Sequence, residues 1–436
     1  MEKSRFILGE YAKNIVKVAS GASVAIFLPL LLSPVLSRIY SQSDYGVMAI
    51  FMGVVVIFTS IITSHYNHTI LIQRTLKGTI NSIALVVLIN ILITSSLTLA
   101  IVFFESTLVS FMSSEKETIP SHFLYLIPAT ICSNGLSVVL FQWFNKYKKY
   151  STITALRLAN TIGAVGFQLG YALILPHYWG TDPNYTGLIL GYALGSFLTL
   201  GVGTVVVIYS RRLSILKLIN WPSIRLIAIK ERDFLIYSLP NDFLFNFANE
   251  LPTFVLKKFL SHSQIGNYSY ARRFSNLPIQ TVANSVLEVF KQKSIEDTHS
   301  TGNCRNIFVK TFKSLALVGL APLIVITLFG PQLFAFVFGK DWYMAGEFAR
   351  LLAPMYYLNF ISGPLSYLFI FHKRLIEDLV VHIYIIFSSA AALWLGHIIF
   401  ESAYGMIGLF SANYCLAYLY YLLRSFKMSQ SAPLTK

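Results

Sequence analysis

Long apolar stretches alternate with short polar segments along all 436 residues of the chain. Each stretch approaches the roughly 20 residues that a helix needs to cross a bilayer. Backbone polar groups find no partners in lipid, so such stretches must be helical, and they lack the alternation of a membrane barrel. We therefore predict an all-α membrane protein with about 12 transmembrane helices, one for each of these windows: Val18–Leu36, Tyr45–Ile72, Ile80–Phe104, His122–Phe144, Ile153–Leu175, Tyr185–Tyr209, Phe234–Val255, Ile265–Phe290, Phe312–Leu328, Phe348–Phe371, Leu379–Ile399 and Tyr404–Leu423.

The charged residues fit this interpretation and predict an orientation. They make up only 12% of the chain, whose mean hydropathy is +0.62, whereas soluble domains carry about a quarter. The chain has 34 Lys and Arg against 19 Asp and Glu. Of these basic residues, 25 fall in loops on the side of the N-terminus and five on the other side. This asymmetry predicts that both termini are cytoplasmic, and it explains the net charge of +15 through anionic lipid headgroups, without nucleic acid.

A basic segment divides the chain into two halves of six predicted spans each. We predict an N-terminal lobe at 1–210, a basic amphipathic linker on the inner leaflet at 211–233, and a C-terminal lobe at 234–436. Residues 35–46 and 255–266 resemble each other at corresponding inter-helix loops, which indicates an internal repeat. Two parallel six-helix lobes around a central cavity are therefore expected. Within the sixth span, three glycines at four-residue spacing predict close helix packing: Gly187, Gly191 and Gly195.

Polar side chains gather in the seventh and eighth spans. A charge inside a bilayer costs about 2.5–3.5 kcal/mol on insertion scales, and such charges mark pathways or pair with each other. The seventh span carries Asp242, Asn246 and Glu250 on one helix face, with Asn249 beside them. The eighth carries five polar residues at strict four-residue spacing and a second arginine, Arg273: Arg272, Asn276, Gln280, Asn284 and Glu288. The second span repeats the spacing with Ser60, Ser64 and His68, and Arg157 and Arg350 are further charges within spans.

Two interpretations of the polar rows on the seventh and eighth spans, which we call the polar stripes, are open. Asp242 or Glu250 pairs with Arg272 or Arg273 and holds the bundle together, or the stripes line a hydrophilic path. The many amides favour the path, since ion pairs alone do not need them. Arginine and amide groups suit phosphates and sugar hydroxyls.

Motifs for other chemistry are missing from the sequence. There is no GxxxxGK[ST] phosphate loop, which argues against direct use of ATP, and no GxSxG, HExxH or CxxC motif. The three cysteines, Cys132, Cys304 and Cys415, lie far apart without metal-ligand spacing. The predicted external loops are short, the longest being about 105–119. We therefore expect a transporter rather than an enzyme, with no catalytic residues, no metal site and no cofactor.

Residues 34–46, Pro-Val-Leu-Ser-Arg-Ile-Tyr-Ser-Gln-Ser-Asp-Tyr-Gly, resemble the first inter-helix turn of Wzx-type O-antigen flippases. These belong to the polysaccharide transporters of the multidrug/oligosaccharidyl-lipid/polysaccharide exporter superfamily. The resemblance implies a MATE-like fold in a bacterial inner membrane. It also implies translocation of an undecaprenyl-pyrophosphate-linked oligosaccharide to the periplasmic leaflet, driven by an H⁺ or Na⁺ gradient. Membrane lipids and the polymerase and chain-length proteins of the same pathway would be partners.

This resemblance suggests roles for the polar residues. Arg272 and Arg273, with Arg157, would hold the pyrophosphate, while the amides of Asn246, Asn249, Asn276 and Gln280 would meet the sugars. Relatives commonly carry an Arg-Tyr-Glu-like triplet where this chain has His65-Tyr66-Asn67. Cation coupling would then fall to a carboxylate of the C-terminal half: Asp242, Glu250 or Glu288.

Two other functions remain to be weighed. A multidrug or small-molecule antiporter of the same superfamily would need an acidic, aromatic cavity, and the arginine pair argues against it. An O-antigen polymerase or ligase would need a sizeable external loop for its chemistry, and the short external connections argue against that.

Overall fold

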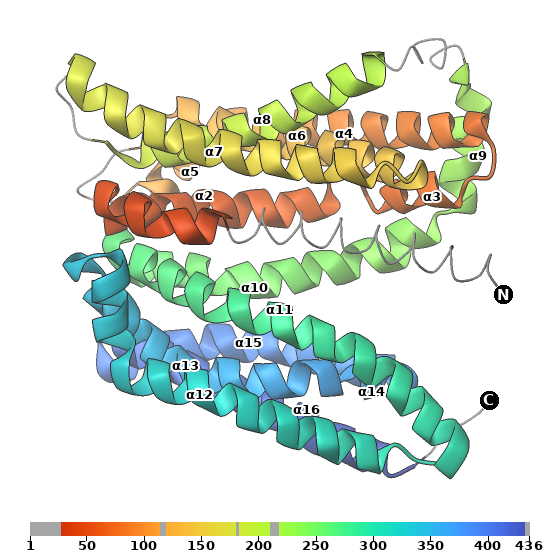
Figure 1. Ribbon diagram of the computed structural model, residues 1–436. Helices are drawn as coiled ribbons and strands as arrows, with labels where there is room; N and C mark the ends of the chain where they lie inside the picture. Colours follow the sequence, from red (N-terminus) through yellow and green to blue (C-terminus); the bar gives the residue numbers. More distant parts are fainter. Residues whose placement is uncertain (1–27, 114–118, 180–182, 210–217, 432–436) are drawn as a thin grey trace. The chain divides into compact units, whose positions relative to one another are not determined.

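The computed structural model describes residues 28–113, 119–179, 183–209 and 218–431, and every regular element in these ranges is a helix (Figure 1). This confirms the all-α class. Seven helices of the described part are long and apolar enough to cross a membrane, so the chain is a multi-pass membrane protein. The count of twelve transmembrane helices stays a prediction. The start of the first predicted span and linker residues 211–217 lie outside the described residues.

The chain forms two compact units, Met1–Phe247 (unit 1) and Ala248–Lys436 (unit 2). The division falls within one helix, α10 (Leu239–Phe259). The predicted lobe and linker boundaries stay a prediction. Unit 1 contains these helices before α10: α2 (Gln42–Ile61), η1 (Tyr66–His68), α3 (Thr69–Ile72), α4 (Leu76–Phe103), α5 (Glu105–Met112), α6 (His122–Lys146), α7 (Tyr150–Trp179), α8 (Tyr185–Tyr209), α9 (Trp221–Lys230) and the π-helix η3 (Phe234–Ser238).

Unit 1 is organised around α6, which packs against α2, α4 and α8. Helix α8 also lies along α7, and glycines allow the close approach. A Cβ atom on Gly191 would strike the Gln168 side chain and the backbone of Ala164, and one on Gly195 would strike the backbone of Asn160. This confirms the packing predicted for the glycines of the sixth span. The segment 105–119 is not simply the external loop that we expected, because its first eight residues form α5.

The second predicted span is broken, contrary to the continuous helix expected for Tyr45–Ile72. Helix α2 ends at Ile61, and Ser64 and His65 adopt left-handed backbone angles, with φ of 47° and 61°. Non-glycine residues enter this region at a cost of about 1–2 kcal/mol, and the right-handed helix cannot continue through it. Ser60, Ser64 and His68 therefore do not lie along one continuous helix, and the prediction of an unbroken second span is wrong.

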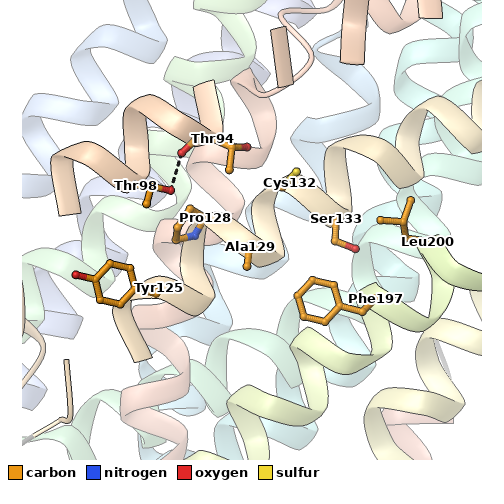
Figure 2. A pocket seen from close by; sticks show the side chains of 9 residues that line it. All are labelled: Thr94, Thr98, Tyr125, Pro128, Ala129, Cys132, Ser133, Phe197 and Leu200. Atoms are coloured by element: carbon orange, nitrogen blue, oxygen red, sulfur yellow. Dashed lines mark hydrogen bonds between the residues drawn. The ribbon is translucent and has the colours of Figure 1, made fainter. Parts of the chain in front are cut away.

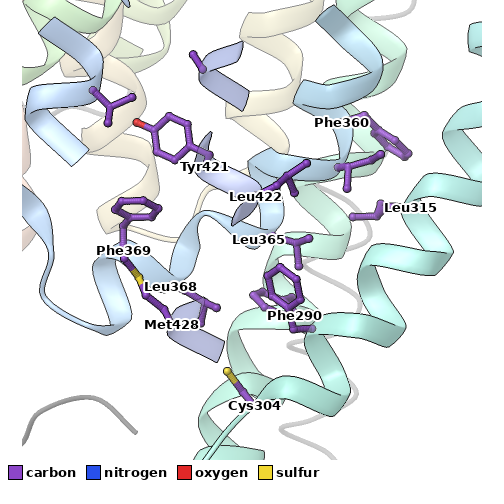
Figure 3. Close-up of a cluster of buried hydrophobic side chains, with 14 of the residues drawn as sticks. Phe290, Cys304, Leu315, Phe360, Leu365, Leu368, Phe369, Tyr421, Leu422 and Met428 are labelled. Carbon is purple, nitrogen blue, oxygen red and sulfur yellow. The ribbon is translucent and has the colours of Figure 1, made fainter. Parts of the chain in front are cut away.

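Unit 2 is built around α13 (Tyr343–Leu365), which packs against α11 (His262–Thr301), α12 (Arg305–Phe338) and α16 (Ala403–Ser429). The remaining helices are η4 (Lys340–Trp342), α14 (Tyr367–Phe371) and α15 (Leu375–Phe400). An apolar core fills one end of the unit, and Figure 3 shows its side chains, with Phe290, Phe360, Leu365 and Leu422 among them. Helix α11 has 40 residues, about 60 Å at 1.5 Å per residue, twice the thickness of a hydrocarbon core.

The two segments of the predicted internal repeat fold in the same way. Ser41 caps α2 and Ser261 caps α11, each in an extended conformation. Both serines form a capping box, with Asp44 and Gln264 respectively, so that two free N–H groups at each helix start are satisfied. The same sequence positions therefore encode the same turn in units 1 and 2.

Candidate functional site

The seventh and eighth predicted spans contribute a charged pair to unit 2. Arg272 of α11 donates two hydrogen bonds to Glu250 of α10, at 2.8 Å from Nη2 to Oε1 and 3.3 Å from Nη1 to Oε2. The two residues lie at similar distances from the turn that joins these helices, which places them opposite each other. Their side chains are 24% and 15% exposed. Of the pairings left open by the sequence, the structure forms the one between Glu250 and Arg272.

Several tyrosines lie near Arg272. Tyr268 and Tyr356, only 2% and 5% exposed, lie within electrostatic range of Arg272, as does Tyr414 of α16. The ring of Tyr418 lies 5.8 Å from that of Tyr414 between centroids. We name Glu250, Arg272 and these four tyrosines the Arg272 site. It combines one cation, one anion and several phenol groups within the helices of unit 2, where α11, α13 and α16 meet.

The Arg272 site has hydrogen-bonding capacity to spare. A guanidinium has five N–H donors, and Glu250 accepts from two, which leaves three. One helical turn further along α11, Oδ1 of Asn276 is buried without a hydrogen-bond partner. Buried polar atoms nearly always form hydrogen bonds. An acceptor without a hydrogen bond, next to an arginine with N–H groups that Glu250 does not use, is therefore a favourable place for a ligand with hydroxyl and anionic groups.

The remaining members of the α11 stripe become exposed towards the end of the helix. Arg273, Gln280 and Asn284 are exposed. Glu288 is 73% exposed and pairs with Lys291 at 2.8 Å. The structure therefore confirms the single helix on which the stripe was placed, and it groups Asn276 rather than Glu288 with the Arg272 site.

Asp242 takes a different partner in unit 1. Its Oδ2 atom lies 3.1 Å from Nε2 of His65, the residue with left-handed backbone angles after α2. The ring of His65 stacks on that of His68 with centroids 5.7 Å apart. On α10, Asn246 donates a hydrogen bond to the carbonyl oxygen of Asp242 at 2.8 Å, and Asn249 is exposed. The sequence did not reveal the His65–Asp242 contact, because it depends on the break in the second span.

The other predicted arginines make contacts of their own. Arg157 is exposed on α7 in unit 1, with its guanidinium carbon 5.9 Å from the centroid of the Phe141 ring. Arg350 of α13 donates to the carbonyl oxygen of Leu328 at 3.3 Å. The sequence analysis missed the tyrosines of the Arg272 site. Their spacing was an available signal, since Tyr268 precedes Arg272 by four residues and Tyr414 precedes Tyr418 by four.

Unit 1 contains a separate pocket of about 350 Å³ (Figure 2). It lies between α4, α6 and α8 and is lined by Thr94, Thr98, Tyr125, Pro128, Ala129, Cys132, Ser133, Phe197 and Leu200. The surface of the pocket wall is mainly apolar. The hydroxyl of Thr98 donates a hydrogen bond to the carbonyl oxygen of Thr94 within α4. None of the polar residues predicted for function lines it.

Comparisons with known proteins agree with this architecture. A family model described as polysaccharide biosynthesis protein matches residues 35–346. An inward-facing multidrug resistance MATE family transporter of the MOP superfamily superimposes with a TM-score of 0.70 at 12% identity, over 95% of this chain and 99% of that chain. The lipid II flippase MurJ, in an inward closed conformation, gives 0.62 at 16% identity, over 94% and 87%. The MATE transporter ClbM in complex with Rb⁺ gives 0.53 at 14% identity, over 96% and 95%. No curated protein matches this chain in sequence.

The helical units and the structural matches define a membrane protein with the fold shared by MOP-superfamily transporters and MurJ. The family match spans well over half of the residues, so the chain belongs to the polysaccharide biosynthesis protein family. Both findings confirm the resemblance to polysaccharide transporters and the MATE-like fold class.

Proposed function

We propose that the protein is a flippase for a lipid-linked oligosaccharide. Its substrate would be an undecaprenyl-pyrophosphate-linked repeat unit of O-antigen or a related surface polysaccharide. The protein would carry this unit from the cytoplasmic to the periplasmic leaflet of a bacterial inner membrane. The observation that carries the proposal is the Arg272 site, with free guanidinium donors and an orphaned amide oxygen in a family of polysaccharide biosynthesis proteins.

The chemistry of the Arg272 site suits such a substrate. The remaining N–H donors of Arg272 offer charge-assisted hydrogen bonds to pyrophosphate oxygens, and the adjacent Arg273 adds a second cation. Asn276 accepts a hydrogen bond from a sugar hydroxyl, and Gln280 continues the same helix face. Tyrosine rings provide flat apolar surfaces for sugar rings, and their hydroxyls provide polar ends. Asn246 and Asn249 offer further amides along α10.

Glu250 is our candidate for gradient coupling. A proton or Na⁺ bound at this carboxylate would neutralise it and weaken its attraction for Arg272, which frees the guanidinium for the pyrophosphate. Alternating access follows if the cation and the substrate favour different states of the protein. Asp242 is the second candidate, because binding of a cation there would compete with His65.

Deletion in the native strain tests the proposed function. We expect loss of surface polymer and accumulation of complete single repeat units on the lipid carrier, protected from reagents that act in the periplasm. Repeat units that reach the periplasmic face unpolymerised or unligated would contradict the flippase and favour a polymerase or ligase. Unchanged polymer together with increased sensitivity to cationic drugs would favour the multidrug antiporter.

Point variants then test the Arg272 site. Arg272→Ala and Arg273→Ala should each abolish surface polymer, with the polymer compared per amount of variant protein in the membrane. A matched control is Lys340→Ala, which removes an exposed cation of unit 2 from η4. Full polymer in the arginine variants would refute the assignment. Glu250→Gln and Asp242→Asn separate coupling from binding, since only the coupling carboxylate should abolish the gradient dependence of transport while substrate still binds.

A further inference from the structure

Helix α9 runs across the end of the helices of unit 1 (Figure 1). Hydrogen bonds of two side chains fix it there. The side chain of Asn81 donates to the carbonyl oxygen of Leu218 at 3.1 Å and accepts from the backbone N–H of Asn220 at 2.8 Å. The hydroxyl of Tyr66 donates to the carbonyl oxygen of Ala228 at 2.9 Å. The helix is therefore tied to α4 and η1 near both of its ends.

One face of α9 belongs to the core of unit 1. Ile224 and Ile227 are 5% and 6% exposed and pack in an apolar cluster with Tyr66, Ile70 and Leu85. These two isoleucines account for the attachment of α9 to the protein. An amphipathic helix that needed only this contact would carry polar residues on its other side.

The opposite face of α9 is also apolar. Leu226 is 65% exposed and Ile229 58%, and Trp221, beside this face in the first turn, is 62% exposed. With 3.6 residues per turn, Leu226 and Ile229 lie side by side on the outer face, and Arg225 and Lys230, both exposed, flank them on either side. The ten residues of α9 include no acidic side chain.

This arrangement matches the chemistry of an anionic membrane surface. Helices in the interface bury one apolar face at the boundary of headgroups and acyl chains and direct Lys and Arg to the phosphates. Tryptophan is enriched at the same depth. The course of α9 across the ends of the spanning helices of unit 1 is the orientation that such binding requires. A protein partner would not need basic residues on both flanks of the apolar strip.

We propose that the outer face of α9 is a binding site for anionic phospholipids. Leu226 and Ile229 insert below the headgroups, and Arg225 and Lys230 bind the phosphates of neighbouring lipids. Because α9 is tied to Asn81 and Tyr66, this site holds the end of unit 1 at the anionic leaflet. The proposal is independent of the substrate that the protein carries.

Quenching of Trp221 tests the proposal in the full-length protein reconstituted into liposomes. The contribution of Trp221 to the fluorescence is the difference between the unchanged protein and Trp221→Phe. Two sets of liposomes have the same mixture of phosphatidylglycerol and phosphatidylcholine, and the bromine atoms are on the chains of one lipid or of the other. We expect stronger quenching by brominated phosphatidylglycerol, with local enrichment of about fivefold for each basic side chain.

The double variant Arg225→Gln, Lys230→Gln should abolish this preference while quenching by total brominated lipid remains. Both side chains are exposed, so the fold of unit 1 should not change, and Lys340→Gln serves as the matched control. Equal quenching by the two brominated lipids in the unchanged protein would overturn the proposal, as would a preference that survives in the double variant. Absence of quenching by either lipid would show that something other than the bilayer covers this face.

Discussion

Exchanging Glu250 for glutamine tests the central contact of the Arg272 site. The substitution keeps the shape of the side chain and one hydrogen-bond acceptor, and it removes the negative charge that faces Arg272. An arginine guanidinium stays protonated in proteins. Glu250→Gln therefore leaves a cation without its counter-charge among apolar and phenolic side chains.

The expected cost follows from the exposure of the pair. Breaking a fully buried ion pair by removing one partner costs about 3–5 kcal/mol, whereas exposed pairs contribute about 0.2–1 kcal/mol. The two side chains are 24% and 15% exposed, which places them nearer the buried limit. We expect Glu250→Gln to destabilise the protein by about 2–3 kcal/mol, and Arg272→Gln by a similar amount. The double variant should lose less free energy of unfolding than the two single variants together, with a coupling energy of about 2 kcal/mol.

Reversible unfolding in mixed micelles of a mild detergent and SDS, followed by tryptophan fluorescence, measures these free energies. The pair formed by Glu288 and Lys291 on α11 is the matched control, because Glu288 is 73% exposed. Its double-mutant cycle should give no more than about 0.5 kcal/mol. A coupling energy below about 0.5 kcal/mol for Glu250 and Arg272 would refute the reasoning, since additive effects identify residues that do not interact.

Three further predictions concern helix packing, backbone strain and thiol reactivity. Gly346→Ala should destabilise unit 2 by about 1–3 kcal/mol in the same unfolding assay, because the added Cβ would collide with backbone atoms of α12. Gly408→Ala is the control and should be tolerated, since a Cβ there meets open space. Equal effects of the two substitutions would contradict this packing. Glu401, which follows α15, has a left-handed backbone with φ of 47°. Glu401→Gly should therefore raise the free energy of unfolding by about 1 kcal/mol, whereas Glu401→Ala should leave it unchanged. A stabilised alanine variant would argue against the left-handed geometry. Cys304 lies just before α12, and burial raises the pKa of its thiol. A water-soluble maleimide should therefore label Cys304 at pH 7 only after unfolding, as measured by mass spectrometry of the peptides. Rapid labelling of the folded protein would contradict the burial of this thiol.

Much of the fold was predictable because the bilayer leaves few choices. Apolar stretches of this length must be helical in lipid, so the all-α class followed from the pattern of apolar residues. The repeated turn at Ser41 and Ser261 was also readable, since a serine followed three residues later by an acidic or amide side chain is a local capping signal. Glycine spacing in the sixth span predicted close helix packing for an equally local reason, and the structure supplied its partner, α7.

The candidate site was only partly predictable. The four-residue spacing placed Arg272 and Asn276 on one helix face, because helix periodicity alone determines this. The choice of Glu250 over Asp242 as the partner of Arg272 depends on where each residue lies relative to the turn between α10 and α11. The tyrosines of the Arg272 site come from α11, α13 and α16, and no pattern within one segment shows that these helices meet.

The sequence by itself therefore determined which segments are helices, which faces of those helices are polar, and where the repeated turns lie. These properties depend on side chains a few residues apart and on the lipid solvent. The tertiary structure decided the break after α2 that brings His65 to Asp242, the approach of tyrosines from α11, α13 and α16 to Arg272, and the two apolar faces of α9. Each of these depends on contacts between residues far apart in the chain, and their energy exists only once the helices of a unit have packed together.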